Sequence, residues 1–422
     1  MTVPDADALV IGAGPAGASC AIRLARTGWR VVLIEQSHYP RQKVCGECLG
    51  AASLQLLDDL GVGEQLRDWA GPEIRQVAWL SRRRAALAEM PLCPFGSHRY
   101  GRALGRDALD SLLLDRARCV GVHVIQPARV QSISGTPGDF AAEYSWRRDG
   151  DRADSGSSRA TISAAVVIDA HGSWERAPVR AGGERCHARS KHASDLLAFK
   201  ATFQNASLSP GVLPLLALPG GYGGMVLADH GRTTLACCLR RDTLRKCRQS
   251  APGADAGAAV EAHLKDSCRE VARMLDGARR DGPWLSIGPL RLGFAAPSAP
   301  GILSVGNAAV EAHPLIGEGI CMALQTAALL TALLPSKPTP IDETLIRDCQ
   351  GRYRRACRRA FAWRIHWARC CAHLAMQRSG ASLLARVLQR RPRTLTFAAQ
   401  LAGKAQSVFP PLRATGRAHE YA

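Results

Sequence analysis

A thiol, a carboxylate and an ammonium group occur within five positions of one polar, glycine-containing segment, residues 40–50. Cys45 can act on a substrate as a nucleophile, Glu47 can relay protons, and Lys43 can bind a carbonyl or phosphate oxygen. The alternative is structural: Cys45 packs in the turn, and Glu47 caps the helix that follows. We take Cys45 and Glu47 as candidate catalytic residues.

Cys45 and Cys48 also form a C-x-x-C pair, a spacing typical of a thioredoxin-like redox pair or of half a zinc site. Zinc would need a second pair, and the adjacent cysteines at 237–238 and 370–371 are unsuitably spaced. The 15 cysteines are odd in number and scattered, so free buried thiols are the default. We therefore predict no metal site.

Tyr222 is a third candidate catalytic residue, in a glycine-rich segment, 220–224, between two apolar runs. Its hydroxyl can line a substrate cavity or donate a proton, whereas ordinary turn glycines are the alternative. We interpret His171 and His313 as structural, with His313 the better candidate for chemistry.

The elements that position these groups begin with an apolar run that ends in Gly12, Gly14 and Gly17, with Glu35 18 residues further on. Gly12 permits a tight turn, Gly14 lets the backbone approach a pyrophosphate, and Gly17 lets a helix pack on the strand. Pro15 and Ala16 open that helix, whose free N–H groups favour phosphate. The pattern predicts an adenine dinucleotide with Glu35 on the ribose; a glycine-rich turn in an ordinary α/β domain is the alternative.

A second strand, small-residue loop and helix occur over residues 301–334. The loop contains Asn307 and the run Gly317-Glu318-Gly319, so a flat ring or a phosphate can lie directly on the main chain. A dehydrogenase that binds only NAD would not need this second loop. The pair of loops therefore favours FAD.

The net charge of +19 is concentrated in the tail, where residues 351–422 hold 15 Lys and Arg against the single acid Glu420. A basic amphipathic helix with Phe361, Ala368 and Ala372 on one face can lie on an anionic membrane, or pack on the body with a solvated basic face. No nucleic-acid motif accompanies the charge, so nucleic-acid binding is not expected. The chain also lacks an apolar run long enough to span a bilayer and a secretory leader, which predicts a cytoplasmic protein, with peripheral membrane contact as the open alternative.

Four segments in a characteristic order resemble FAD-dependent oxidoreductases of the p-hydroxybenzoate-hydroxylase fold, and among them the geranylgeranyl-reductase-like branch. These segments are the Gly12–Gly17 pattern with Glu35, the R-x-K-x-C-G-E motif at 41–47, residues 100–106, and residues 305–319. The resemblance covers roughly residues 8–334 and implies FAD as cofactor and NAD(P)H as electron donor.

The resemblance also implies roles for individual residues. The ADP half of FAD would be held by the first glycines and Glu35, and Arg106 would lie near the flavin phosphate or ribityl group. Asn307 would contact the pyrophosphate and ribityl, and the run 317–319 would lie under the isoalloxazine. The cofactor-binding prediction comprises Gly12, Gly14, Pro15, Ala16, Gly17, Glu35, Arg41, Lys43, Arg106, Asn307, Gly317, Glu318 and Gly319.

The chain departs from the family pattern at two positions. Asn307 replaces the usual Asp, which keeps a hydrogen-bonding oxygen without its charge. His171-Gly172 replaces an Asp-Gly pair that hydroxylases use for FAD and NAD(P)H, so direct reduction by NAD(P)H is in question. The W-x-W-x-I-P signature of flavin halogenases is missing, which argues against halogenation.

The expected fold class is α/β: a Rossmann-like FAD-binding domain, an inserted, mostly antiparallel β-sheet substrate domain and a helical C-terminal tail. Within the substrate domain we expect an exposed hairpin near Trp79 and a helix over residues 258–275. The predicted boundaries are 1–75, 100–175 and 295–340 for the FAD-binding domain, 76–99 and 176–294 for the substrate domain, and 341–422 for the tail.

Three functions follow from this pattern. The first, slightly favoured, is flavin-hydroperoxide hydroxylation by a monooxygenase of an apolar isoprenoid, polyketide-derived or aromatic substrate. The second is reduction of a C=C bond in a lipid-like substrate by a hydride from flavin, with a proton from Tyr222, Cys45 or water. The third is a flavin-binding partner without turnover in a biosynthetic assembly.

Overall fold

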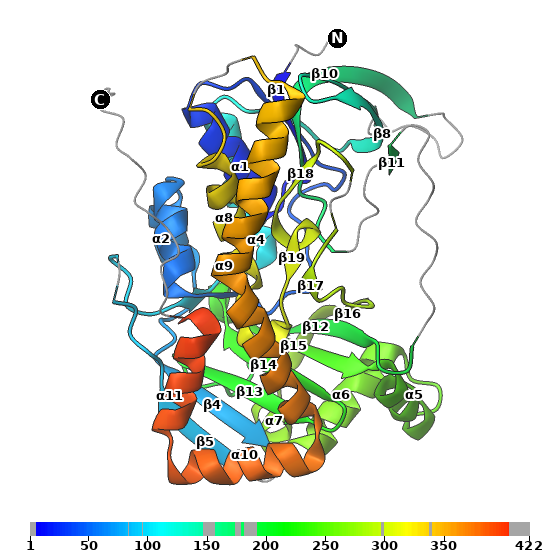
Figure 1. Cartoon of the computed structure of the whole chain (residues 1–422). Coiled ribbons are helices and arrows are strands. Elements are labelled where there is room, and N and C mark those ends of the chain that lie inside the picture. Colours follow the sequence, from blue (N-terminus) through cyan, green and yellow to red (C-terminus); the bar gives the residue numbers. More distant parts are fainter. Residues whose placement is uncertain are drawn as a thin grey trace.

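Two mixed β-sheets, one above the other in Figure 1, form the body of the computed structural model, and a long C-terminal helix runs alongside both. The structure describes residues 6–82, 84–94, 96–146, 157–173, 179–180, 192–296, 299–336 and 340–404. The expected α/β fold class is confirmed. The last part of the predicted tail, residues 405–422, lies outside the described residues.

The first sheet has the strand order β11-β8-β9-β10-β1-β2-β7, with β18 paired to β10. Its centre is parallel, because β1 pairs in parallel with both β2 and β10. The apolar β1 and β2 are almost wholly buried, as parallel strands covered on both faces must be. The strands are β1 (Ala6–Ile11), β2 (Val31–Ile34), β7 (His123–Ile125), β8 (Arg129–Thr136), β9 (Asp139–Trp146), β10 (Ser158–Asp169), β11 (Val179–Arg180) and β18 (Leu303–Ser304).

The second sheet has the order β16-β12-β15-β14-β13-β4-β5 and is antiparallel except for the β13–β4 pair. Its strands are β4 (Gln76–Ser81), β5 (Arg84–Glu89), β12 (Leu196–Gln204), β13 (Val212–Leu218), β14 (Gly221–Leu227), β15 (Thr233–Arg240) and β16 (Arg279–Ile287). Short ladders join β3 (Cys48–Leu49) to β6 (Arg102–Ala103) and β17 (Gly293–Phe294) to β19 (Val310–Glu311).

Helices cover both sheets. The N-terminal group is α1 (Pro15–Arg26), α2 (Ala51–Asp59), α3 (Gly63–Trp69) and α4 (Arg106–Cys119). The second sheet carries α5 (Arg241–Ser250), α6 (Ala256–Ser267) and α7 (Arg269–Met274). The remaining helices are α8 (Gly319–Thr331), α9 (Glu343–Met376), α10 (Arg378–Arg390) and α11 (Arg393–Ala399).

Two local predictions need correction. The single helix expected over residues 258–275 is divided into α6 and α7, because the backbone is extended at Cys268 (φ −144°). The expected hairpin is present as β4–β5, but Trp79 is only 4% exposed, since α10 and α11 cover that face of the sheet.

The contact between α1 and β1 depends on Gly17. A Cβ built at Gly17 would lie 1.9 Å from the carbonyl oxygen of Gly12, so the helix approaches the strand more closely than any side chain allows. Gly12 itself has φ +98°, which favours glycine, and its own Cβ would lie 2.6 Å from the carbonyl oxygen of Ala170. The first glycine loop is therefore set by backbone contacts.

We expect Gly17→Ala to lower the free energy of unfolding by about 1–3 kcal/mol, because α1 must move away from β1 to admit the methyl group. Denaturant unfolding of the cofactor-free protein measures the effect. Gly319→Ala is the matched control, since its Cβ would meet no atom within 4 Å. Equal stability of Gly17→Ala and the parent protein would contradict the close contact.

Candidate functional site

One cavity lies between the two sheets and is lined by residues from both. The first glycine loop, the 40–48 segment and the 305–320 loop form one side, and strands β12 to β15 form the other. The predicted site residues that line it are Gly12, Gly14, Pro15, Ala16, Glu35, Arg41, Lys43, Cys45, Glu47, Arg106, Tyr222, Asn307, Gly317 and Gly319. Segments far apart in sequence thus meet at one place.

Two predicted cofactor-binding residues do not line the cavity. Gly17 lies behind it, against Gly12. The Glu318 side chain is 1% exposed, and one of its oxygens lies 3.3 Å from where a Cβ at Gly50 would be. Glu318 also contacts the Cys321 thiol one turn into α8. The Glu318 carboxylate therefore faces the interior, and Gly17 packs against the turn as the sequence predicts, while direct cofactor contact through the backbone of either residue stays a prediction.

The glycines that do line the cavity leave room for a cofactor. A Cβ at Gly46, Gly172 or Gly319 would meet no atom within 4 Å, so the bare backbone there faces open space. Helices α1 and α8 both begin at the cavity, after Gly14 and Glu318, and no side chain among the described residues caps either N-terminus. Uncapped helix N-termini attract phosphate. The residues present therefore fit a dinucleotide such as FAD.

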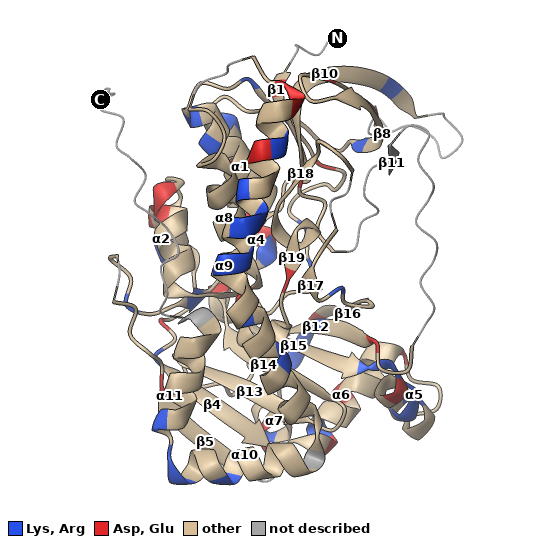
Figure 2. Ribbon diagram, viewed as in Figure 1, with Lys and Arg blue, Asp and Glu red and all other residues tan. Residues whose placement is uncertain are grey.

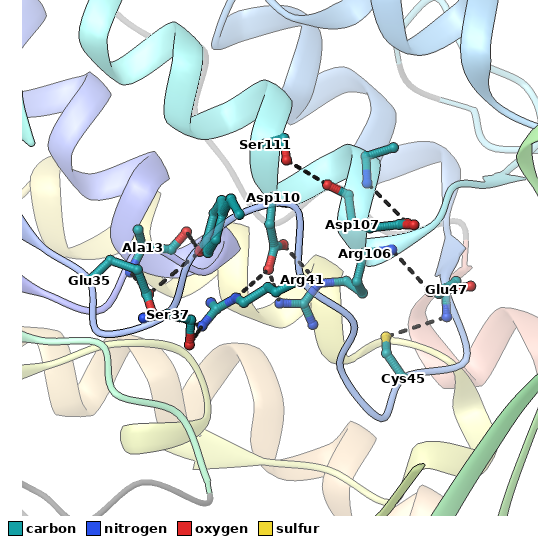
Figure 3. Close-up of polar contacts among 12 residues, drawn as sticks. Ala13, Glu35, Ser37, Arg41, Cys45, Glu47, Arg106, Asp107, Asp110 and Ser111 are labelled. Atoms are coloured by element: carbon teal, nitrogen blue, oxygen red, sulfur yellow. Dashed lines mark hydrogen bonds and ion pairs between the residues drawn. The ribbon is translucent and has the colours of Figure 1, made fainter. Parts of the chain in front are cut away.

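A chain of alternating charges, Glu35–Arg41–Asp110–Arg106, runs along this side of the cavity (Figure 3). Arg41 Nη1 donates to Glu35 Oε1 at 2.8 Å, and Arg106 pairs with Asp110 through two hydrogen bonds of 2.8 Å. Burial lowers the pKa of Arg106, but Asp110 more than compensates and raises it above the ordinary value. The Arg106 guanidinium therefore stays charged beside Gly14.

The Arg41 and Arg106 guanidinium groups both lie beside Gly14. A Cβ at Gly14 would lie 3.8 Å from an Nη atom of both Arg41 and Arg106, so two positive groups flank the N-terminus of α1. Glu35, by contrast, already accepts hydrogen bonds from the backbone N–H groups of Ala13 and Ser37 as well as from Arg41. Its carboxylate shapes the loop in addition to lining the cavity.

Asp110 was missed by sequence reasoning. Its signal is an acidic residue four positions after Arg106 in a helix, on the same side as the buried leucines. An i, i+4 pair of this kind is common on exposed helices, so the pattern alone does not indicate that the aspartate is buried.

Glu47 joins the 40–48 segment and α4 to the second sheet. Its carboxylate pairs with the Lys200 ammonium of β12, accepts a hydrogen bond of 2.5 Å from Thr234 Oγ1 of β15, and accepts one of 3.0 Å from the Arg106 backbone N–H. Glu47 and Lys200 are each 3% exposed. Glu47 therefore caps α4, not the next helix α2 as the structural alternative expects.

Lys200 and Thr234 were not predicted. Lys200 interrupts the apolar run of residues 196–203, and a lysine in the middle of a buried strand is a usable signal for a buried ion pair. Its partner lies 153 residues away, so the pairing cannot be read from spacing.

Cys45 is half-buried at the cavity, where its sulfur accepts a hydrogen bond of 3.3 Å from the Glu47 backbone N–H and contacts the Arg106 guanidinium. Cys48 is buried and also lines the cavity. Neither cysteine forms a disulfide. Within the described parts of the chain, no group of three or more His, Cys, Asp or Glu side chains is placed to hold a metal ion.

Tyr222 of β14 and His313 of the opposite loop meet across the cavity wall. The tyrosine hydroxyl and His313 Nδ1 are 3.0 Å apart, and both residues are buried. Burial, followed by the charge of Arg369, lowers the pKa of His313 to about 4, so the imidazole is neutral near pH 7. Burial raises the pKa of Tyr222 well above its usual value, so the phenol keeps its proton.

The two family departures also lie at the cavity. Asn307 Nδ2 donates to Ser173 Oγ at 2.7 Å, and more distantly to the buried Glu311 at 3.5 Å. His171 Nδ1 lies 2.5 Å from an oxygen of Asp169, the last residue of β10. An acidic group is thus retained near this turn, two positions before His171.

Lys200→Met should lower the free energy of unfolding by about 3–5 kcal/mol, because it leaves the Glu47 carboxylate buried without its counter-charge. Adding Glu47→Gln should recover part of that loss. Lys265→Met breaks a half-exposed pair with Glu261 and should cost less than about 1 kcal/mol. Equal effects of the two lysine substitutions in urea unfolding would contradict a bridging role.

Titration of His313 should make stability depend on pH. The folded-state pKa of about 4 lies below the ordinary value of 6.5, so the unfolded chain binds the extra proton first as the pH falls. Stability therefore decreases as the pH drops below about 6.5. Between about pH 7 and pH 5 this group should account for a loss of about 2 kcal/mol. The loss should be absent from His313→Gln, and a parallel pH profile of the two proteins would refute the assignment.

Comparisons with known proteins show the family of the chain. A family model described as an FAD binding domain matches residues 5–336. Menaquinone reductase from Mycolicibacterium smegmatis is 26% identical over 352 residues, which cover 78% of this chain and 76% of the relative. Menaquinone reductase from Mycobacterium tuberculosis is 26% identical over 368 residues, covering 83% of this chain and 82% of the relative.

Solved structures share the fold. The myxobacterial chondrochloren halogenase CndH superposes with a TM-score of 0.71 at 20% identity, over 95% of this chain and 91% of its own. PqsL, a probable FAD-dependent monooxygenase from Pseudomonas aeruginosa, gives 0.65 at 17% identity, over 90% and 99%. Since the family model spans most of the chain, the protein belongs to the FAD binding domain family and is an FAD-dependent oxidoreductase.

Proposed function

We propose that the protein uses FAD to reduce a carbon–carbon double bond in a largely apolar, lipid-like substrate. The observation that carries the proposal is the buried Tyr222–His313 pair, a proton source at an otherwise apolar cavity wall. The menaquinone reductases among its relatives, similar over three quarters of the chain, support this choice. Membership of the geranylgeranyl-reductase-like branch is part of the same proposal.

The cofactor would lie along the charged side of the cavity. Arg41 and Arg106 would face the pyrophosphate beside Gly14, and the backbone of residues 317–319 would lie against the isoalloxazine. Bound FAD, once reduced, supplies a hydride equivalent. We infer NAD(P)H as the electron donor.

The substrate would occupy the apolar side. Phe199, Leu213, Leu215 and Val226 line the cavity from the second sheet, so they can bind a hydrocarbon chain and exclude water. Reduction of a double bond consumes one hydride and one proton. Tyr222 holds a proton at this wall, and its hydrogen bond to neutral His313 orients the hydroxyl.

Hydroxylation, which the sequence analysis slightly favours, stays the second candidate. The same pair supports it, because neutral His313 can accept a proton from a phenolic substrate through Tyr222. The halogenase and monooxygenase structures, below 25% identity, support the fold alone. Cys45 and Glu47 stay predictions as catalytic residues, although three hydrogen-bond donors already occupy the Glu47 carboxylate.

Anaerobic mixing of the reduced holoenzyme with a polyprenyl quinol separates the two candidates, because the quinol headgroup is already reduced and only a double bond of the chain can accept the hydride and proton. Reduction predicts flavin reoxidation without O₂ and a product heavier by two hydrogens, whereas a product that forms only with O₂ and gains an oxygen atom would overturn the proposal. Mass spectrometry identifies the product.

Tyr222→Phe should slow flavin reoxidation by the substrate about 100-fold, because it removes the general acid, and should leave the flavin absorbance spectrum unchanged. Tyr144→Phe, in a buried tyrosine of the first sheet, is the matched control and should react at the parental rate. An unaffected rate in Tyr222→Phe would remove Tyr222 from the reaction.

A further inference from the structure

The C-terminal region does not present the apolar face that its sequence predicts. Phe361, Ala368 and Ala372 of α9 are each 0% exposed, because this face packs on α8 and the second sheet. Of the two alternatives for the basic amphipathic helix, packing on the body therefore describes α9. No helix in the described ranges is both long and apolar enough to cross a bilayer.

Helix α10 is different, because it is apolar on two sides. Ala381, Ala385 and Leu388 face inward and pack on β4 and β5. On the outer side, one turn apart, Leu383 is 64% exposed and Val387 is 42% exposed. A Leu–Val pair in open solvent has no structural benefit for the folded chain.

The surroundings of this pair are basic. Arg386 and Arg390 are exposed on the same helix, and Arg391 and Arg393 follow directly. Residues 378–404 contain no Asp or Glu at all. Figure 2 shows α10 at the lower edge of the molecule with Lys and Arg as its coloured positions. We call Leu383, Arg386, Val387 and Arg390 the α10 face.

We propose that the α10 face binds peripherally to a membrane that contains anionic lipids. Exposed aliphatic side chains can enter the boundary between headgroups and acyl chains, while arginines on the same helix are attracted to lipid phosphates. A second copy of this chain fits poorly, because a symmetric contact would bring the arginines of both copies together.

Helix α10 packs on the same apolar cluster that lines part of the cavity. Its inward residues belong to one continuous apolar cluster with Leu213 and Tyr222, which line the cavity. Docking at α10 would therefore bring the substrate side of the cavity next to the lipid phase. Membrane binding itself does not depend on which reaction the enzyme performs.

Sedimentation of the full-length holoenzyme with sucrose-loaded vesicles tests the proposal. We expect binding to phosphatidylcholine vesicles that contain phosphatidylglycerol, and binding at least about 10-fold weaker to pure phosphatidylcholine or in high salt. Leu383→Glu/Val387→Glu should weaken binding at least about 10-fold, and Arg386→Gln/Arg390→Gln by a similar factor.

Leu92→Glu is the matched control, since this leucine is 49% exposed on a loop outside α10, and it should bind like the parent. Flavin absorbance and the thermal unfolding midpoint verify that each variant is folded. Binding that is independent of lipid charge, or unchanged in Leu383→Glu/Val387→Glu, would overturn the proposal. So would a dimer, measured by light scattering without vesicles, that the same substitutions dissociate.

Discussion

The buried carboxylate of Glu47 is the constraint on which the site depends. It connects the loop that carries Cys45 to the first turn of α4 and to two strands of the second sheet. A carboxylate buried in this position is stable only with its hydrogen-bond donors in place, so the two sides of the cavity must be correctly packed together. The ion pair thereby specifies one arrangement of the 40–48 segment and α4 relative to the second sheet.

Local patterns explain which parts of the fold could be predicted. The glycine loops, the parallel strands β1 and β2, and the return of β10 to the first sheet are encoded in short segments whose periodicity is visible. The sequence does not reveal that Lys200 and Thr234 pair with Glu47, because these residues are far apart in the chain. It also does not reveal that Asp110 is buried, so these contacts were not predicted. The burial of the Glu318 side chain was not predicted either, because a position between two cavity-lining glycines does not indicate which way the side chain points.

The tail shows how tertiary packing changes the meaning of an amphipathic pattern. The spacing of apolar residues in α9 correctly predicts a helix with one buried face, yet composition cannot say whether protein or lipid covers that face. In the structure the body covers α9, whereas α10 retains apolar side chains on both its inner and outer sides. Only the three-dimensional arrangement separates the two helices.

Helix α9 is long enough to contact elements of both sheets' surroundings. Its 34 residues extend about 50 Å and contact both α8 and the strands β13 and β14 of the second sheet. A continuous helix that packs on both parts resists bending, so a hinge motion that separates the sheets would have to bend α9 or detach it from one of them. Movements of loops and side chains at the cavity leave these contacts of α9 in place.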